Sequence, residues 1–371
     1  MRTGRPGLIT GCLGLRRRYS SRMNSSSRRI GFGIVGLGMI AEFHARAIAQ
    51  VEGARLVGVA SRDADKTRTF AARHGAEVTA ATVAELAGRP EIDVICVTTP
   101  SGAHLEPALA AIRAGKHVVI EKPIETTLER TDRILRAAAD AGVQVAAIFQ
   151  ARFGDGARRV KAALDAGRFG RLVLASAYVK WHRPPAYYTG WKGTLDLDGG
   201  GALINQAIHA IDLLQWFGGM PAEVFCWKTR RVHLGIEAED TAAATLRFGS
   251  GALGTIEAST ALWPGWDRRL EITGENGSVV LEEDRIARWD FRVGAPGDAA
   301  VKAAGGASAL GSGASAPNAI SIEGHRRQLA DLVDALREHR PPAIDGRDAR
   351  RAVALVRALY ASAERGAPVP V

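Results

Sequence analysis

Cysteines, aromatic residues and long apolar runs are scarce in this chain of 371 residues. The three cysteines, Cys12, Cys96 and Cys226, have no paired spacing and no histidine or further cysteine at metal-ligand separation. We therefore expect no disulfide framework, no metal site and a reduced, cytoplasmic protein. The chain has no run of about eighteen apolar residues, which excludes a membrane-spanning segment.

Acidic residues are absent from the first part of the chain, and this explains most of the net charge of +10. Residues 1–29 hold eight arginines and no Asp or Glu, so the remaining body is nearly neutral. A neutral body offers no extended basic face for phosphates, and we expect no nucleic-acid partner. The leader is typical of a mitochondrial transit peptide, but a disordered tail, a vector remnant or a true start at Met23 fits as well. We exclude it from the fold.

Residues 30–148 alternate short apolar runs with amphipathic segments. Continuous apolar strands separated by helices are typical of a parallel sheet that is covered on both faces. The sequence therefore predicts an α/β domain of the doubly wound Rossmann type. The expected strands are residues 30–35, 55–60, 93–97, 117–120 and 143–149.

Residues 149–371 have a different pattern, with strand-like segments separated by turn signals. We expect an α+β domain with an open, largely antiparallel sheet and helices on one face. Two helices, 322–338 and 346–365, should end the chain. Residues 294–318 are rich in Ala, Gly and Ser and are expected to form a flexible surface insertion. The expected strands are residues 171–179, 223–228, 240–248, 251–260, 268–273 and 277–281.

A glycine-rich turn follows the first apolar run. Gly36, Gly38 and Ala41 form a G-x-G-x-x-A pattern between a predicted strand and a predicted helix. The first glycine allows the tight turn, the second lets a pyrophosphate approach the backbone, and the small third residue lets helix and strand pack closely. The pattern predicts dinucleotide binding on the amides of the helix N-terminus. The expected contacts are Gly36, Leu37, Gly38, Met39 and Ile40.

The end of the second apolar run selects between NAD and NADP. NAD-binding domains place an acid there to hold the ribose 2′-hydroxyl, whereas this chain has Ser61 and Arg62, with its first acid at Asp63. Serine and arginine can hold a 2′-phosphate, so the sequence favours NADP over NAD. The alternative is that Arg62 is solvated and that Asp63 only caps the next helix.

A Thr-Thr-Pro turn follows the next buried run, again at the carboxyl edge of the predicted sheet. Ligands of doubly wound domains bind at this edge. We expect contacts with the cofactor from Thr98, Thr99, Pro100 and His104. The alternative is a turn that caps a helix at Ser101.

Glu121, Lys122 and Pro123 directly follow the run 117–120. A lysine at this edge points toward the cleft where nicotinamide should lie, and we expect Glu121 and Lys122 to line the cofactor site. The Lys122 ammonium can bind a substrate hydroxyl and favour its alkoxide as hydride leaves.

A polar stripe occurs on the strongly periodic segment 202–217. Asn205, His209 and Asp212 are four and three residues apart, so they share one face of a helix. The glycines of 199–201 would let this helix begin close to a ligand. A histidine oriented by a neighbour is a natural base for a hydroxyl proton, although a packed helix histidine is the alternative.

Aromatic and basic residues near this helix are expected on the substrate side of the cleft. Rings can pack on sugar C–H faces while polar groups bind hydroxyls. The alternative for each ring is a place in the core or an interface. His325 suggests nothing beyond an ordinary histidine. The expected substrate contacts are Lys122, Arg152, Tyr188, Trp191, Lys192, Asn205 and His209.

These motifs together resemble the Gfo/Idh/MocA oxidoreductase family, from residue 30 to the C-terminus. The resemblance rests on the glycine turn with His44 after it, on residues 121–123 and on the block 190–212. It implies hydride transfer between NAD or NADP and a hydroxyl carbon of a cyclic sugar, polyol or nucleotide sugar. The alternatives are an elimination that retains NAD, and an NAD(P)-sensing regulator.

The resemblance also implies roles for single residues. It makes Lys122 and His209 the catalytic pair, with His209 as acid and base and Lys122 as the polarising group. Asn205 is the third catalytic residue expected, although many members have aspartate at its position. Asparagine can position a hydroxyl but cannot relay charge, so it supports His209 less strongly as a base. The family further implies a cis bond between Lys122 and Pro123, and a homodimer or homotetramer formed through the exposed face of the second sheet.

Overall fold

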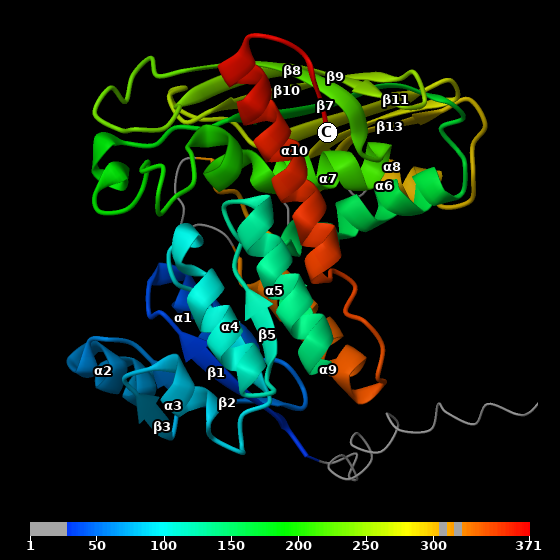
Figure 1. Ribbon diagram of the computed structural model, residues 1–371. Coiled ribbons are helices and arrows are strands. Elements are labelled where there is room, and N and C mark those ends of the chain that lie inside the picture. The colour runs from blue at the N-terminus through cyan, green and yellow to red at the C-terminus, as the bar shows by residue number, and fades with distance from the viewer. Residues whose placement is uncertain (1–27, 304–309, 315–320) are drawn as a thin grey trace, which may run out of the picture.

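The computed structural model describes residues 28–303, 310–314 and 321–371 of the chain. The expected leader, 1–29, lies outside these residues except for Arg28 and Arg29. Two sheets with their helices form an upper and a lower body in Figure 1. No helix among the described residues is both long and apolar enough to cross a bilayer.

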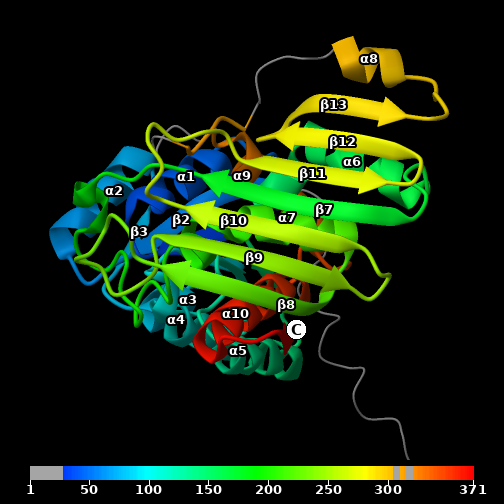
Figure 2. The same cartoon turned by 90° about the horizontal axis from the view of Figure 1, so that it is seen from above.

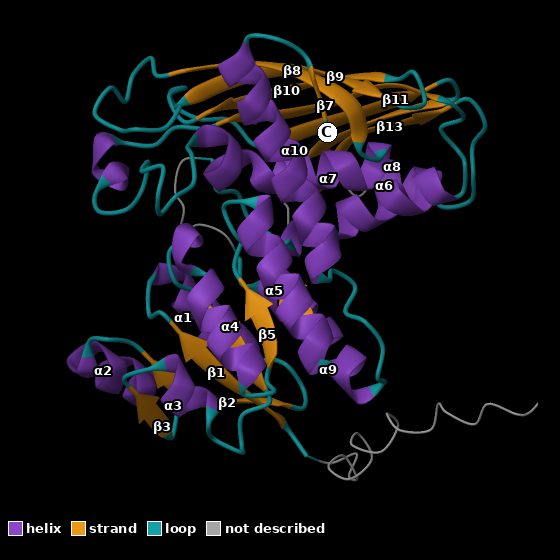
Figure 3. Ribbon diagram, in the orientation of Figure 1, coloured by secondary structure: helices purple, strands orange, loops and turns teal. Residues whose placement is uncertain are grey.

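The first domain is a parallel sheet of six strands in the order β3-β2-β1-β4-β5-β6, as the sequence predicts for a Rossmann domain. Helices cover both faces of the sheet (Figure 3), and β1 and β4 are buried along their whole length. The elements are β1 Ile30–Val35, α1 Met39–Ile48, β2 Ala54–Ala60, α2 Ala64–His74, β3 Val78–Ala80, α3 Val83–Ala87, β4 Val94–Val97, α4 Leu105–Arg113, β5 His117–Ile120, α5 Leu128–Ala141 and β6 Val145–Ala147.

The second domain is a sheet of eight strands, β13-β12-β11-β7-β10-β9-β8-β14, in which only the β7 and β10 pair is parallel. Seen from above, one face is uncovered (Figure 2), whereas α6, α7 and α10 lie against the other. The open, largely antiparallel sheet is confirmed. The elements are α6 Asp155–Asp165, β7 Leu172–Lys180, α7 Ile208–Gly218, β8 Pro221–Thr229, β9 Thr241–Phe248, β10 Leu253–Ser259, β11 Arg269–Gly274, β12 Gly277–Glu282, β13 Arg285–Phe291, α10 Gly346–Arg365 and β14 Val369–Pro370.

Helix α9, Glu323–Arg337, returns to the first domain although it lies late in the sequence. It contacts α1, and Figure 1 shows it beside the lower body. Its apolar residues join the core formed by β1, α1 and β4. The spatial division therefore differs from the expected division at residue 148. The residues of α9 in this core are Leu329, Leu332, Val333 and Leu336.

The expected insertion at 294–318 has defined contacts in its described parts. Residues Asp298–Ala303 form helix α8, and Asp298 accepts hydrogen bonds from Arg168 and Trp289. The Gly313 and Ala314 carbonyls accept hydrogen bonds from the Arg183 guanidinium. Residues 304–309 and 315–318 lie outside the described residues. The flexibility expected for this insertion stays a prediction, and its described parts are anchored through a charged side chain and through backbone carbonyls.

Candidate active site

The glycine-rich turn between β1 and α1 fits a pyrophosphate. Gly36 has φ +87°, and a Cβ there would lie 2.9 Å from Thr99. A Cβ at Gly38 would meet nothing within 4 Å, so the space above this residue is open. Gly38 is the N-cap of α1 and gives the helix no side-chain cap, which leaves the first amides free for an anion. The hydroxyl of Thr98 donates to the carbonyls of Val35 and Gly36 and so fixes the turn.

The turn after β4 is held by His104. Its Nδ1 lies 2.9 Å from the Pro123 carbonyl oxygen and its Nε2 lies 2.9 Å from that of Thr99. Burial lowers the pKa of His104, although nearby Glu125 opposes the shift. Both ring nitrogens face the backbone, and the expected contact of this histidine with the cofactor stays a prediction. His104 ties the β4 turn to the turn that carries Lys122.

At the end of β2, Asp63 caps the next helix, which is the alternative given above to a role in cofactor selection. This residue is the N-cap of α2, and its carboxylate accepts the amide of Lys66. The Ser61 hydroxyl oxygen accepts the Asp63 amide, and Arg62 is exposed. The exposed guanidinium is the one feature here that favours a 2′-phosphate.

Lys122 follows β5 and reaches toward α7. Its Nζ donates to the Asn205 carbonyl at 2.6 Å. The bond to Pro123 is cis, as the resemblance implied. Burial, followed by the positive charge of Lys192, lowers the pKa of Lys122 to about 8. A lysine with this pKa can gain and lose a proton near neutral pH.

His209 lies close to Lys122 at the first turn of α7. Burial, and after it the Lys122 ammonium, hold the pKa of His209 well below its ordinary value. Its Nδ1 is buried and has no hydrogen-bond partner among the described residues, and its ring meets Phe149 edge to face. His209 is therefore a neutral imidazole without an orienting carboxylate.

The polar stripe does not act as one unit. Ala202–Ala207 form a π-helical turn before α7, and the Asn205 amide donates to Asp198. Asp212 is fully buried and binds Arg152 through hydrogen bonds of 2.7 Å and 2.6 Å. Neither residue orients His209, so the expectation of a histidine supported by its helical neighbours is wrong. π-Turns often occur at functional sites, and this one presents the Asn205 carbonyl to Lys122.

Arg152 is a structural residue in this arrangement. It is almost fully buried between Asp212 and Asp348, and its charge lies over the Trp216 ring. Its donors already have acceptors inside the protein, so the predicted substrate contact does not follow from the structure. The residue instead satisfies the buried carboxylate of Asp212.

The three glycines of 199–201 serve packing within the protein. A Cβ at Gly199 would lie 2.4 Å from the Thr126 side chain, and one at Gly200 would lie 2.2 Å from the Tyr360 hydroxyl. The Gly201 amide donates to Glu239, whose carboxylate also caps the following turn. The close approach is to protein rather than, as expected, to a ligand.

Two cations beside Lys122 lack acidic partners within hydrogen-bond distance among the described residues. The Lys192 ammonium lies 3.9 Å from the centre of the Trp191 ring and also near Tyr187. Arg183 is 1% exposed, and its guanidinium donates to Gln206 and to backbone carbonyls. Arg183 was not predicted from the sequence, where a Trp-x-Arg segment gives no signal of its depth. The site therefore places two cations beside Lys122, with the buried Asp198 carboxylate acting on both lysines from beyond hydrogen-bond distance.

Two tyrosines complete this wall of the site. Gln206 donates to the Tyr187 hydroxyl at 2.7 Å, and the Tyr188 hydroxyl lies 2.6 Å from that of Thr260. Burial raises the pKa of both tyrosines to about 12, so both remain neutral phenols. Tyr188, Trp191 and Lys192 therefore lie on one short segment of this wall. Their predicted contact with the substrate stays a prediction.

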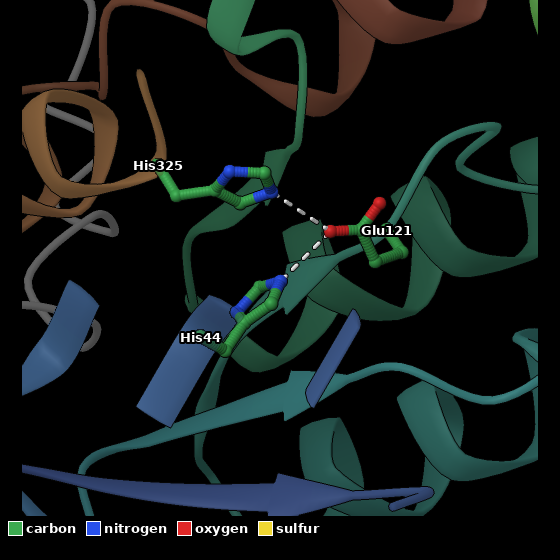
Figure 4. Close-up of side chains that lie close together, drawn as sticks. All are labelled: His44, Glu121 and His325. Atoms are coloured by element: carbon green, nitrogen blue, oxygen red, sulfur yellow. Dashed lines mark hydrogen bonds and ion pairs between the residues drawn. The ribbon is translucent and has the colours of Figure 1, made fainter. Parts of the chain in front are cut away.

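A buried group that the sequence did not reveal lies beneath Lys122. His44 from α1, Glu121 from the end of β5 and His325 from α9 meet in the interior, as Figure 4 shows. We call these three residues the Glu121 cluster. No spacing rule could have found it, because the members are far apart in the sequence.

Two family models match the chain. The model described as "Oxidoreductase family, NAD-binding Rossmann fold" covers residues 30–149, and the model described as "GFO/IDH/MocA C-terminal domain" covers residues 157–280. The two matches lie in different domains. The first includes the glycine turn and Lys122, and the second includes His209.

Curated relatives include enzymes that act on sugars and polyols. A 1,5-anhydro-D-fructose reductase of Ensifer adhaerens is 30% identical over 67% of this chain and 74% of its own length. A myo-inositol 2-dehydrogenase of Thermotoga maritima is 30% identical over 68% of this chain and 75% of its own length.

Solved structures of similar fold include two WlbA dehydrogenases in complex with NADH and UDP-GlcNAcA. The protein from Bordetella pertussis is 33% identical, with a TM-score of 0.83 over 93% of this chain and 98% of its own. The protein from Chromobacterium violaceum is 30% identical, with a TM-score of 0.84 over 94% of this chain and 97% of its own.

Proposed function

The chain belongs to the GFO/IDH/MocA oxidoreductase family, whose first domain binds NAD, and on this premise we propose that it oxidises a hydroxyl carbon of a sugar that carries a carboxylate. The observation that carries the proposal is the placement of Lys122 beside the unpaired cations Lys192 and Arg183.

NAD is the proposed cofactor. The open space at Gly38 and the uncapped amides of α1 suit a pyrophosphate. When bound, the nicotinamide supplies the hydride acceptor. The preference for NADP that the sequence suggested rests on Ser61 and the exposed Arg62, whereas the NADH in both WlbA structures supports NAD.

Lys122 is the proposed proton acceptor. As the C–H bond gives up its electron pair with the hydride, the hydroxyl must lose its proton so that the carbonyl can form. The neutral Lys122 amine accepts this proton, and in the reverse direction its ammonium returns it. A pKa of about 8 suits this exchange. The low pKa of His209 makes it a poor base, so we assign it the positioning of the hydroxyl by a hydrogen bond. Oxidation should therefore speed up as the pH rises through about 8.

Lys192 and Arg183 give the substrate side its charge preference. The Lys192 ammonium lies over two ring faces and has no hydrogen-bond acceptor among the described residues, so it retains its capacity to donate hydrogen bonds to an anion. Arg183 adds a buried positive charge whose pKa is lowered by burial. A carboxylate on the substrate could accept hydrogen bonds from the Lys192 ammonium, and hydrogen bonds to ionised groups are the strong ones.

The test compares matched substrates that differ only in charge. Purified protein with NAD would receive UDP-N-acetylglucosamine or the corresponding uronic acid, and reduced-nicotinamide absorbance would be recorded. We expect kcat/KM to be about 10- to 100-fold higher for the acid, as one charge-assisted hydrogen bond allows.

A charge-removing variant completes this test. Lys192→Met should abolish most of the preference, whereas the exposed Lys66→Met on α2 should keep it. Equal rates for both sugars with the natural protein would refute the anionic substrate while leaving the dehydrogenase assignment intact.

We also propose a homodimer or homotetramer that forms through the uncovered face of the second sheet. Leu174 and Leu253 are cross-strand neighbours, and both are exposed, as is Trp227 on β8. Size-exclusion chromatography with light scattering should give two or four chains, and a monomer would contradict the proposal. The free, buried thiols of Cys96 and Cys226 fit a cytoplasmic location, which cell fractionation would test.

A further inference from the structure

The Glu121 cluster joins three segments under the reaction site. One carboxylate oxygen of Glu121 lies 2.8 Å from His44 Nε2 and 3.3 Å from His325 Nε2. The other oxygen accepts the Lys122 amide at 3.1 Å. All three side chains are buried, and Figure 4 shows both imidazoles pointing at the carboxylate. The catalytic lysine is thus attached by its own backbone to a carboxylate held from α1 and α9.

The hydrogen-bond pattern fixes the protonation of the cluster. Nδ1 of His44 and Nδ1 of His325 are buried without a partner among the described residues. A charged imidazole would bury an unsatisfied N–H there, which costs more than a bare lone pair on a neutral ring. We therefore place the proton of each ring on Nε2, where it is donated to Glu121. Two neutral donors and one carboxylate leave a buried negative charge.

The same pattern argues against a metal ion between these residues. A histidine that binds a metal through Nε2 carries its proton on Nδ1 and almost always donates it to an oxygen. Neither Nδ1 here has such an acceptor among the described residues. The separation of 2.8 Å between His44 and Glu121 is that of an ordinary hydrogen bond.

We propose that His44 and His325 are positioning residues that hold an ionised Glu121 beneath Lys122, so that helix α9 helps to set the proton affinity of the catalytic amine. Burial alone would raise the pKa of Glu121, but the hydrogen bonds from His325 and His44 outweigh it and hold this pKa well below its ordinary value. The resulting charge opposes the lowering of the pKa of Lys122.

Other charged groups also shift the pKa of the Lys122 amine, so the test must leave them unchanged. Lys192 and Arg183 lower the pKa of Lys122, while Asp198 raises it together with Glu121. The remaining titratable groups that face Glu121 or Lys122 are His209 on α7, Cys96 on β4 and His104 beside the β4 turn. None of these is changed in the variants below.

The inference deepens the proposed function, since it assumes that Lys122 moves the proton, so the test needs a readout without turnover. Amine labelling by acetic anhydride, followed by mass spectrometry of the Lys122 peptide, gives the pH midpoint of this lysine in the free protein. Glu121→Gln should lower the midpoint by about one pH unit, because the favourable charge is lost. His325→Phe should lower it by a smaller amount, because a buried carboxylate with one donor fewer takes up a proton more readily.

The conservative variant separates positioning from packing. His325→Gln keeps an N–H donor and should restore the midpoint toward that of the natural protein, and thermal melting would show that each variant is folded. A midpoint shift in labelling with an unchanged kinetic midpoint would support the cluster and contradict the proton role of Lys122. Unchanged labelling in both Glu121→Gln and His325→Phe would overturn the inference. So would a stoichiometric metal ion that His325→Phe loses.

Discussion

Lys122→Met should reduce kcat/KM for the oxidation about 10²- to 10⁴-fold, the usual contribution of a positioned proton-transfer group. The methionine keeps most of the volume of the buried stem but cannot accept a proton. The affinity for NAD should change little, because the pyrophosphate site at Gly36 and Gly38 is on another turn. Steady-state kinetics together with a fluorescence titration of NADH would check both parts.

The variant Lys122→Arg distinguishes a role of Lys122 in proton transfer from a role in which its positive charge only polarises the substrate. A guanidinium keeps the positive charge but does not lose its proton in proteins, so this variant should remain as inactive as Lys122→Met. Recovery of activity with arginine would show that charge alone suffices and would return the proton to His209. Lys66→Met, on the exposed side of α2, serves as the control.

Gly38→Val should weaken the binding of NAD about 10- to 100-fold without unfolding the protein. The backbone at Gly38 has φ −79°, which any residue adopts, and a Cβ there meets nothing within 4 Å. The added methyl groups would fill the space in which we place the pyrophosphate, and overpacking of this kind costs about 1–3 kcal/mol. Isothermal titration calorimetry would measure the loss.

The matched control is Gly249→Val. This residue lies in the turn between β9 and β10, where a Cβ also meets nothing within 4 Å. The melting temperature of the Gly249→Val variant and its affinity for NAD should equal those of the natural protein. Unchanged affinity in Gly38→Val would mean that the cofactor does not approach this glycine.

Periodicity predicted most of the fold because most elements bury one continuous apolar surface. The strand residues 93–97 were expected and β4 is fully buried, whereas β3 was missed because it has only three residues and none of them is buried. Helix α3 was missed as well, because five residues are too few to show a helical repeat, although two of them are buried. Such short elements depend on the neighbours that cover them rather than on a repeating pattern.

The chemical site was predictable only as far as single residues carry a signal. Lys122 was found because it follows a buried strand, and the structure places it against the Asn205 carbonyl. The shared helix face of Asn205, His209 and Asp212 did not supply an orienting neighbour for His209. Helical spacing cannot reveal that Arg152, from a distant segment, binds the Asp212 carboxylate. Contacts between distant segments, including the Glu121 cluster, require the folded chain.

The return of α9 to the first domain affects how the protein can be synthesised. The core beside β1 and α1 is completed by α9 residues as far as Leu336. A nascent chain that has emerged only to residue 150 therefore lacks part of the apolar cover of its NAD-binding sheet. The core of that half is complete only once α9 has been synthesised, and a fragment cut at the boundary between the two matched family models would expose the surface that α9 covers.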